Sequence, residues 1–198
     1  MSKVVSLVYR CAFLLVLVLL TAVTARAAEV DITAFAGIQR QGKLTLQGVP
    51  GTSVNLIRTL NSSDFGVFGG RIAHGHIFGG EHTLAFSPNF IDVDTHAFIY
   101  NSNVFVQAPL PVVRPYATAG LGLIHTSGEG LGVFGTRLAI NYGGGVKLLP
   151  VGPVGLQVDV RGYSIPSAEF RVFRTESQRV DFIEASVGIV FSVGKVGK

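Results

Sequence analysis

The chain contains no tryptophan and a single cysteine, and only 14% of its 198 residues are charged. Cys11 precedes the first hydrophobic stretch, so we expect no thiol, disulfide or cysteine-ligated metal in the exported protein. The apolar run from Ala12 to Val23 has 12 residues, whereas a helix needs about 20 to cross a bilayer. No later run is long enough either. The sequence therefore offers no membrane-spanning helix.

The N-terminus has the features of an export signal. Lys3 and Arg10 precede the apolar run, and a small-x-small cleavage site ends at Ala27. Residues 1–27 are predicted to be a signal peptide and residues 28–198 to form one domain. Removing the three basic residues of the signal from the 16 of the whole chain leaves 13 against 12 acidic ones. This balance gives no concentrated basic face, so nucleic-acid binding is not expected.

The rest of the chain alternates between apolar and polar residues with a period of two, as strands with two different faces do. In one segment Leu156, Val158 and Val160 lie on one face, while Gln157, Asp159 and Arg161 lie on the other. No segment after the signal shows a helical period, so the fold class is all-β. The eight predicted strands are residues 29–38, 64–72, 81–88, 96–106, 114–124, 137–149, 156–163 and 181–193.

Alternation alone leaves open whether the apolar face points inward, as in a soluble barrel, or outward toward lipid. Three features favour lipid, and the third is the pattern of the closing strand given in the next paragraph. The glycines, 25 in all, often share the face with the charged residues, as in a crowded narrow lumen. The connections also alternate between longer and shorter, as external loops and periplasmic turns do when both termini are periplasmic. The prediction is an eight-stranded, antiparallel, up-and-down transmembrane β-barrel.

The closing segment and three earlier motifs match a known class of barrel. In residues 186–193, the order polar-x-Gly-x-x-aromatic-x-apolar, with Gly188, Phe191 and Val193, resembles the signal by which the barrel-assembly machinery recognises outer-membrane proteins. The chain resembles the small eight-stranded outer-membrane β-barrel family that includes outer membrane proteins A and W. This resemblance implies a monomer in the outer membrane of a Gram-negative-type bacterium, in contact with outer-membrane lipids. The three other matching motifs are residues 30–37, 115–122 and 141–147.

Polar residues are expected to gather on the inward face. Charges in a narrow lumen need partners, since an unpaired buried ion costs several kcal/mol. The lumen of an eight-stranded barrel is just wide enough for its own side chains. We therefore expect a hydrogen-bonded network that fills and stiffens the barrel, and a gated ion path remains the alternative. Its predicted members are Glu81, Asn101, Asn103, Lys147, Asp159, Arg161 and Glu184.

One short segment has residues of an enzymatic kind. His125, Ser127 and Glu129 would share the lipid-facing side of a strand at the external rim, where a His–Ser pair with a carboxylate forms an activated nucleophile. The His-x-Ser order is similar to that of outer-membrane lipid A deacylases, which are also eight-stranded barrels. Their pattern continues with asparagine, whereas this chain has Gly128. The competing interpretation is the glycine-rich start of an external loop, and it predicts no catalytic residue.

Two weaker patterns complete the survey. His74 and His76 are spaced as two metal ligands can be, but a short periplasmic turn explains them better, so no metal or cofactor is expected. Arg171, Arg174 and Arg179 are expected in the last external loop and make lipopolysaccharide a candidate partner, since arginine suits phosphate groups. The predicted function is a non-catalytic outer-membrane barrel with a structural or surface-interaction role. The alternatives are a small-solute conduit and a lipid A deacylase-like enzyme.

Overall fold

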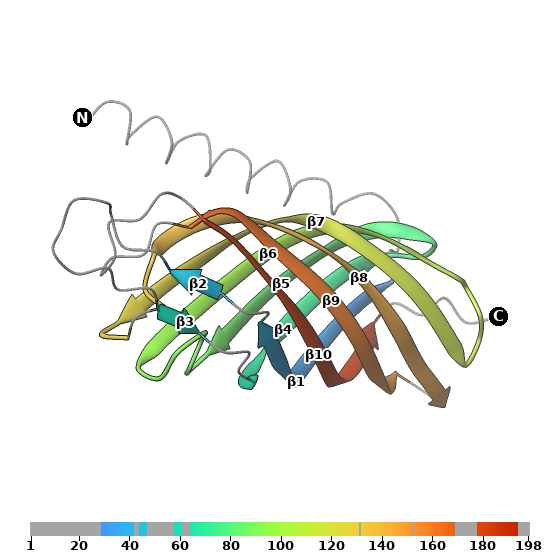
Figure 1. The fold of residues 1–198 in the computed structure, drawn as a ribbon. Helices are drawn as coiled ribbons and strands as arrows, with labels where there is room; N and C mark the ends of the chain where they lie inside the picture. Colours follow the sequence, from blue (N-terminus) through green and yellow to red (C-terminus); the bar gives the residue numbers. More distant parts are fainter. Residues whose placement is uncertain are drawn as a thin grey trace, which may run out of the picture.

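The computed structural model shows a closed barrel of antiparallel strands (Figure 1). Residues 1–27, predicted as a signal peptide, and Arg171 and Arg174 of the last external loop lie outside the described part of the chain. Arg179, the third arginine predicted in this loop, is described and pairs with the exposed Asp181 at 2.9 Å. The structure describes residues 29–41, 44–46, 58–60, 64–130, 132–151, 153–168 and 178–193.

Eight long strands form the barrel wall, and each pairs with its neighbours in the chain, so the predicted eight-stranded up-and-down topology is confirmed. The wall closes where the first strand pairs with the last, from Val30 opposite Val193 to Gln41 opposite Phe182. Closure pairs every edge, as a membrane-spanning sheet requires. The wall strands are β1 (Val30–Gln41), β4 (Asp64–Gly75), β5 (Phe78–Ser87), β6 (Thr95–Gln107), β7 (Val113–Gly128), β8 (Gly135–Val151), β9 (Val154–Ala168) and β10 (Gln178–Val193).

The observed strands differ from the predicted ones mainly at their ends. β7 extends to Gly128 and β9 to Ala168, beyond the predicted ends at 124 and 163. A separate two-stranded sheet of β2 (Leu44–Leu46) and β3 (Arg58–Leu60) lies in the connection between β1 and β4 and was not predicted. Three residues are too few for a period of two to be recognised, so the sequence pattern missed this sheet.

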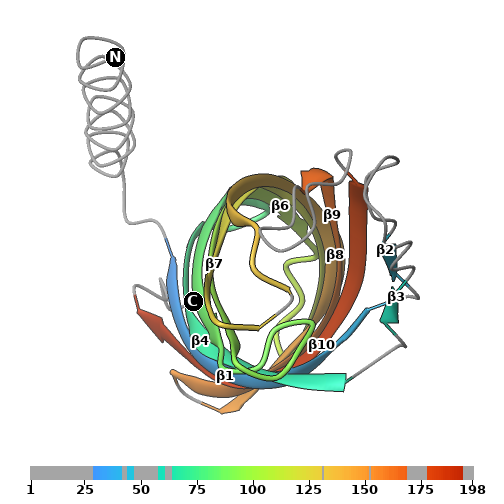
Figure 2. The ribbon, with the colours of Figure 1, turned by 60° about the vertical axis from the view of Figure 1, so that its left-hand side comes forward.

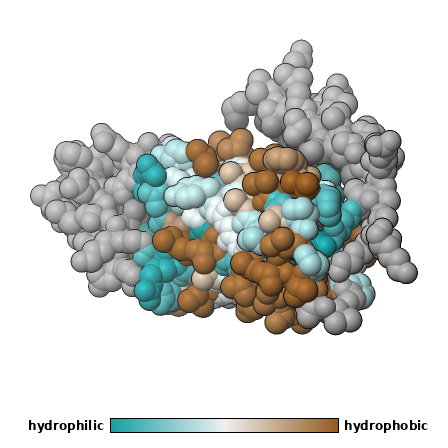
Figure 3. Space-filling view, turned by 90° about the vertical axis from the view of Figure 1, so that its right-hand side faces the viewer, coloured by the Kyte–Doolittle hydropathy of each residue, from teal (hydrophilic) through white to brown (hydrophobic). Residues whose placement is uncertain are grey.

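The two faces of the wall have opposite chemistry. Val158 is 49% exposed on the outer face, whereas its neighbours Gln157 and Asp159 are each 2% exposed in the lumen. The predicted orientation, apolar outward and polar inward, is therefore correct for this strand. Figure 3 shows brown hydrophobic patches over much of one face of the described surface. No helix in the described part of the chain is long and apolar enough to span a membrane.

Two luminal glycines leave space for the polar side chains of the lumen. Gly143 and Gly145 of β8 face Arg161 and Asp159 of β9. A Cβ atom at Gly145 would lie 2.5 Å from the Cβ atom of Asp159, and one at Gly143 would lie 2.8 Å from the Cα atom of Arg161. Both contacts are shorter than real Cβ atoms show. Side chains on β8 at these positions would therefore displace the charged residues of β9.

Candidate functional site in the barrel lumen

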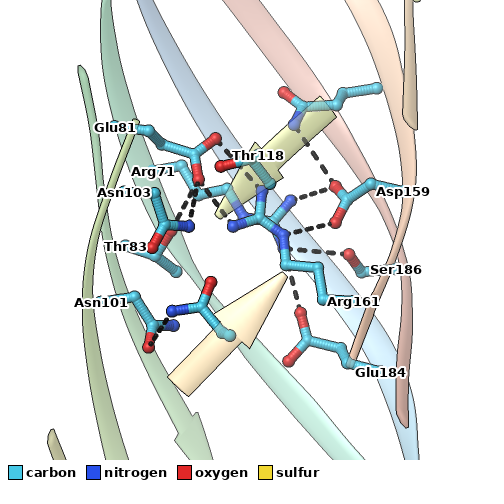
Figure 4. Close-up of polar contacts among 12 residues, drawn as sticks. Arg71, Glu81, Thr83, Asn101, Asn103, Thr118, Asp159, Arg161, Glu184 and Ser186 are labelled. Carbon is cyan, nitrogen blue, oxygen red and sulfur yellow. Dashed lines mark hydrogen bonds and ion pairs between the residues drawn. The ribbon is translucent and has the colours of Figure 1, made fainter. Parts of the chain in front are cut away.

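Two arginines occupy the middle of the lumen and bind carboxylates that come from opposite parts of the wall (Figure 4). Arg161 of β9 donates two hydrogen bonds to Glu81 of β5, at 2.6 and 3.1 Å, and a third to Asp159 at 2.8 Å. Arg71 of β4 donates to Asp159 and, at 3.0 Å, to Glu184 of β10. These five residues, which we call the central network, link four strands across the lumen. Each is at most 3% exposed.

Uncharged groups add hydrogen bonds to the central network, although the buried Nε atom of Arg71 has no partner among the described residues. Gln39 donates to Glu184 at 2.7 Å, and Gln157 donates to Asp159 at 3.3 Å. Ser186 accepts from Arg71 at 3.0 Å, and the guanidinium of Arg71 also lies 3.7 Å from the centre of the Phe35 ring. Bidentate and charge-assisted hydrogen bonds of this kind hold a planar guanidinium in one orientation. The network therefore fixes the relative positions of the strands that it joins.

Two further ion pairs lie between the central network and the end of the barrel that carries the termini. Lys147 of β8 pairs with Asp31 of β1, which also accepts a hydrogen bond from Ser192. Nearer the terminus, Arg114 pairs with Glu29. Each of these four charged side chains is at most 7% exposed. Charged side chains therefore fill the lumen at successive levels along its axis.

At the end opposite the termini, which we call the external end, the lumen is filled by aromatic side chains instead. Phe90, in the connection between β5 and β6, is fully buried, and its ring lies 5.2 Å from that of Phe65 and 5.3 Å from that of Phe182. The ring of Phe134, from the connection between β7 and β8, lies 6.3 Å from the ring of Phe90. Figure 2 shows connections turning into the circle of strands. We call Phe65, Phe90, Phe134 and Phe182 the aromatic plug.

Backbone hydrogen bonds hold the connections of the aromatic plug in place. The Phe90 N–H donates to the Thr95 carbonyl at 2.7 Å, which closes the turn that carries Phe90. The Asp94 carbonyl accepts from Glu129 at 3.1 Å and from Gly130 at 3.2 Å, so the two connections are tied to each other. The plug is therefore part of the folded barrel.

All seven residues predicted to form a luminal network lie on the inward face and are buried. Glu81, Asp159, Arg161 and Glu184 belong to the central network, whereas Lys147 makes a separate pair with Asp31. The amide nitrogen of Asn101 donates to the Tyr163 hydroxyl at 3.1 Å. The Asn103 amide lies within 3.4 Å of the Glu81 carboxylate.

The sequence pattern missed Arg71, although this residue holds two carboxylates of the central network. Its strand was predicted, but the inward residues before it, Phe65 and Val67, are apolar because they belong to the external end of the lumen. The inward face of β4 thus changes from apolar to polar along its length, which hides the alternation. Arg71 could have been found from its spacing, because it lies four residues after Val67 and two after Gly69, on the same inward face of β4.

The residues of the predicted His–Ser–Glu set, His125, Ser127 and Glu129, lie at the end of β7 and in the turn after it. His125 and Ser127 both point outward at the external end of β7, and the His125 Nδ1 atom lies 2.8 Å from the Thr136 hydroxyl. Ser127 pairs with His96 of β6. Gly128 has φ of 119°, which ends the strand, so the exposed Glu129 lies in the following turn and does not continue their row. The structure thus brings two of the three residues onto one face.

The remaining predicted positions lie at the ends of strands. His76 is in the turn after β4, with Nδ1 3.3 Å from a Glu29 carboxylate oxygen. In the described residues, no group of three or more His, Cys, Asp or Glu side chains is arranged to hold a metal. In the proposed insertion signal, Phe191 and Val193 are exposed on the outer face of β10, and Gly188 faces the lumen.

Comparison with known proteins places the chain in a structural class. No protein-family model matches it, and no curated protein is similar to it in sequence. Neisserial surface protein A is similar in structure, with a TM-score of 0.61 and 15% identity over 82% of this chain and 96% of that one. The chain has the fold of the small eight-stranded outer-membrane β-barrels, as its sequence motifs predicted.

Two barrels from Pseudomonas aeruginosa support the same class. The outer membrane protein OprG gives a TM-score of 0.55 at 11% identity, over 85% of this chain and 97% of that one. The N-terminal barrel domain of OprF gives 0.52 at 14% identity, over 83% and 97%. At these identities the similarity concerns the fold.

Proposed function

We propose that the protein is a non-catalytic, non-conducting barrel of the outer membrane, with a structural or surface-interaction role. The observation that carries this proposal is the filled lumen, with ion pairs from the terminal end to its middle and the aromatic plug at its external end. A lumen of this width has room for its own side chains and little else. The protein needs no cofactor in this role and acts as a monomer.

Opening the lumen to a solute would disrupt both kinds of filling. The buried arginines would have to leave their carboxylates, and breaking a buried pair costs about 3–5 kcal/mol. Phe90 would also have to leave its aromatic neighbours, and losing a buried phenylalanine costs about 3–5 kcal/mol. A passive conduit has a lumen that is open without such changes, so the filled lumen favours a closed wall over the small-solute conduit.

The same barrel offers two surfaces for partners. Its apolar outer face suits outer-membrane lipids, and its closing strand suits recognition by the barrel-assembly machinery during insertion. The external connections would face the cell exterior, where lipopolysaccharide is a candidate partner. A surface-interaction role would therefore depend on the loops, and a structural role on the stiffness that the central network supplies.

Conductance of the protein in planar lipid bilayers tests the non-conducting state. We expect that adding the wild-type protein does not raise the conductance of the bilayer above its protein-free value. Matched variants are Arg71→Ala, which opens the central network, and Phe90→Ala, which opens the plug. We expect conductance steps only when both are combined, because each layer closes the lumen alone. Stable steps from the folded wild-type protein would refute the proposal and favour the conduit.

Lipid A analysis tests the non-catalytic part of the proposal. Cells that express the protein should keep an unchanged lipid A mass profile, because the His125 imidazole is bonded to Thr136 and the Asn of the deacylase pattern is replaced by Gly128. Loss of one acyl chain, reversed by Ser127→Ala in an equally abundant variant, would instead establish the deacylase-like enzyme.

A further inference from the structure

A groove of about 510 Å³ lies in the outer wall of the barrel, across β1, β4, β5 and β6. Its floor is Gly70, which points outward and pairs with Ala34 of β1 and Leu84 of β5. Of these three residues, Gly70 has no side chain and Ala34 has only a methyl group, so the wall is hollowed between Ile32 and Leu84. The groove opens on the outer face, and inward-facing residues, among them Thr33 and Arg71, complete its lining from below.

Aromatic rings border the groove toward the external end. The Phe68 and Phe86 rings meet edge to face at 5.6 Å, and the Phe86 and Phe98 rings lie 4.8 Å apart. A histidine and a tyrosine form another part of the rim. His82 and Tyr100 stack with centres 6.2 Å apart, and their Nδ1 and hydroxyl groups are 3.0 Å apart. Since these polar groups bond each other, they present ring surface to the groove, and its lining is largely apolar.

The chemistry of the lining identifies what fills the groove. Apolar cavities stay dry, so water is a poor occupant. An empty cavity would lose dispersion contacts along its whole lining. The groove is continuous with the outer face of a transmembrane barrel, and this face contacts hydrocarbon chains. A flexible acyl chain is therefore the occupant with matching chemistry.

The end of the barrel toward which the groove extends indicates which lipid of the membrane can enter it. Ile32 and Ile72 border it, two and three residues from the ends of β1 and β4 that lie beside the short turns and the termini. This end is periplasmic in a barrel of this topology. We propose that the groove binds one acyl chain of a phospholipid that enters from the periplasmic side and remains bound as an ordered lipid. This site does not depend on whether the lumen conducts.

Native mass spectrometry of the full-length folded protein in detergent, with a diacyl phosphatidylethanolamine added, tests the proposal. Gly70→Leu should fill the groove without strain, because a Cβ atom there meets only the Thr33 carbonyl oxygen, at 3.7 Å. Gly66→Leu is the matched control: it lies on the same outward face of β4, has no atom within 4 Å of its Cβ position, and does not border the groove.

We expect the wild type and Gly66→Leu to retain one phospholipid. Gly70→Leu should bind it about tenfold more weakly, the change expected when contacts to roughly two methylene groups are lost. A heat-dependent gel shift verifies that each variant is folded. If Gly70→Leu does not fold, Leu84→Phe fills the same groove from β5 and should give the same loss.

Equal lipid retention by the folded Gly70→Leu and Gly66→Leu variants would overturn the proposal. So would a wild-type dimer that Gly70→Leu dissociates, because a second copy of the chain would then be the occupant. Retention of single-chain detergent with no preference for the phospholipid would also overturn it, since the groove would then hold any hydrocarbon.

Discussion

Arg71→Met is the sharpest test of the central network, because methionine keeps much of the length and packing of arginine while removing its charge. Arg71 is the residue that joins Glu184 to Asp159. Without it, Asp159 keeps Arg161, whereas Glu184 keeps only an uncharged hydrogen-bond donor, Gln39. A carboxylate buried to 1% exposure would then lack a cation. Removing one partner of a buried pair costs about 3–5 kcal/mol, so we expect a loss of this size in the free energy of unfolding.

The assay is urea unfolding of the barrel in lipid vesicles, followed by far-UV circular dichroism and by the heat-dependent gel shift. Arg40→Met is a matched control, because Arg40 makes a similar bidentate contact with Asp64, at 2.6 Å for both bonds. That pair is exposed, with 68% and 46% of the two side chains accessible, so solvent screens it and its loss should be much smaller.

A second substitution separates lost attraction from the cost of an unpaired charge. Adding Glu184→Gln to Arg71→Met removes the carboxylate that was left without a cation, so it should restore a large part of the lost stability. Two results would refute the reasoning. One is equal destabilisation by Arg71→Met and Arg40→Met. The other is a further loss, without any recovery, when Glu184→Gln is added.

Three further predictions concern the outer face, the aromatic plug and the independence of the ion pairs. Val158→Arg should destabilise the barrel by about 2–4 kcal/mol near the membrane midplane, measured by the same urea unfolding, while Val158→Leu stays close to wild type; a harmless Val158→Arg would mean that this face does not contact lipid. Phe90→Ala should cost about 3–5 kcal/mol and reduce the near-ultraviolet dichroism of the packed rings; an unchanged unfolding midpoint would show that the plug is not packed in solution. Lys147→Met and Arg71→Met should have additive effects within about 0.5 kcal/mol, because their ion pairs share no residue; a coupling well above this in a double-mutant cycle would show one continuous network.

The wall of the barrel was predictable because strand alternation is a local property. Side chains of a strand point to alternate faces whatever the strand pairs with, so the order of residues 156–161 already separates a lipid face from a luminal face. The same pattern identified Glu81, Lys147, Asp159, Arg161 and Glu184 as luminal. Strand ends were predicted less well, since β7 continues through Thr126 with no change in period that would mark where the membrane ends.

The partners of the luminal charges were decided by the tertiary structure. Glu81 and Arg161 are 80 residues apart in the chain, and Asp31 and Lys147 are 116 apart. Whether these residues meet depends on the register of every strand between them and on the closure of β1 against β10. A shift of one residue in any register would turn a luminal side chain outward. Lys147 therefore pairs with Asp31, a partner that its own strand does not indicate.

The aromatic plug and the outer groove also depend on distant parts of the chain. Phe90 lies in a connection that, by sequence, reads as an external loop, but the rings of Phe65 and Phe182 form an apolar site for it at the mouth of the barrel. Gly70 and Ile32 line one hollow only because β1 and β4 lie side by side in the closed wall. Local alternation thus determines which way each side chain points, whereas register and closure determine what it meets, because those contacts join residues far apart in the sequence.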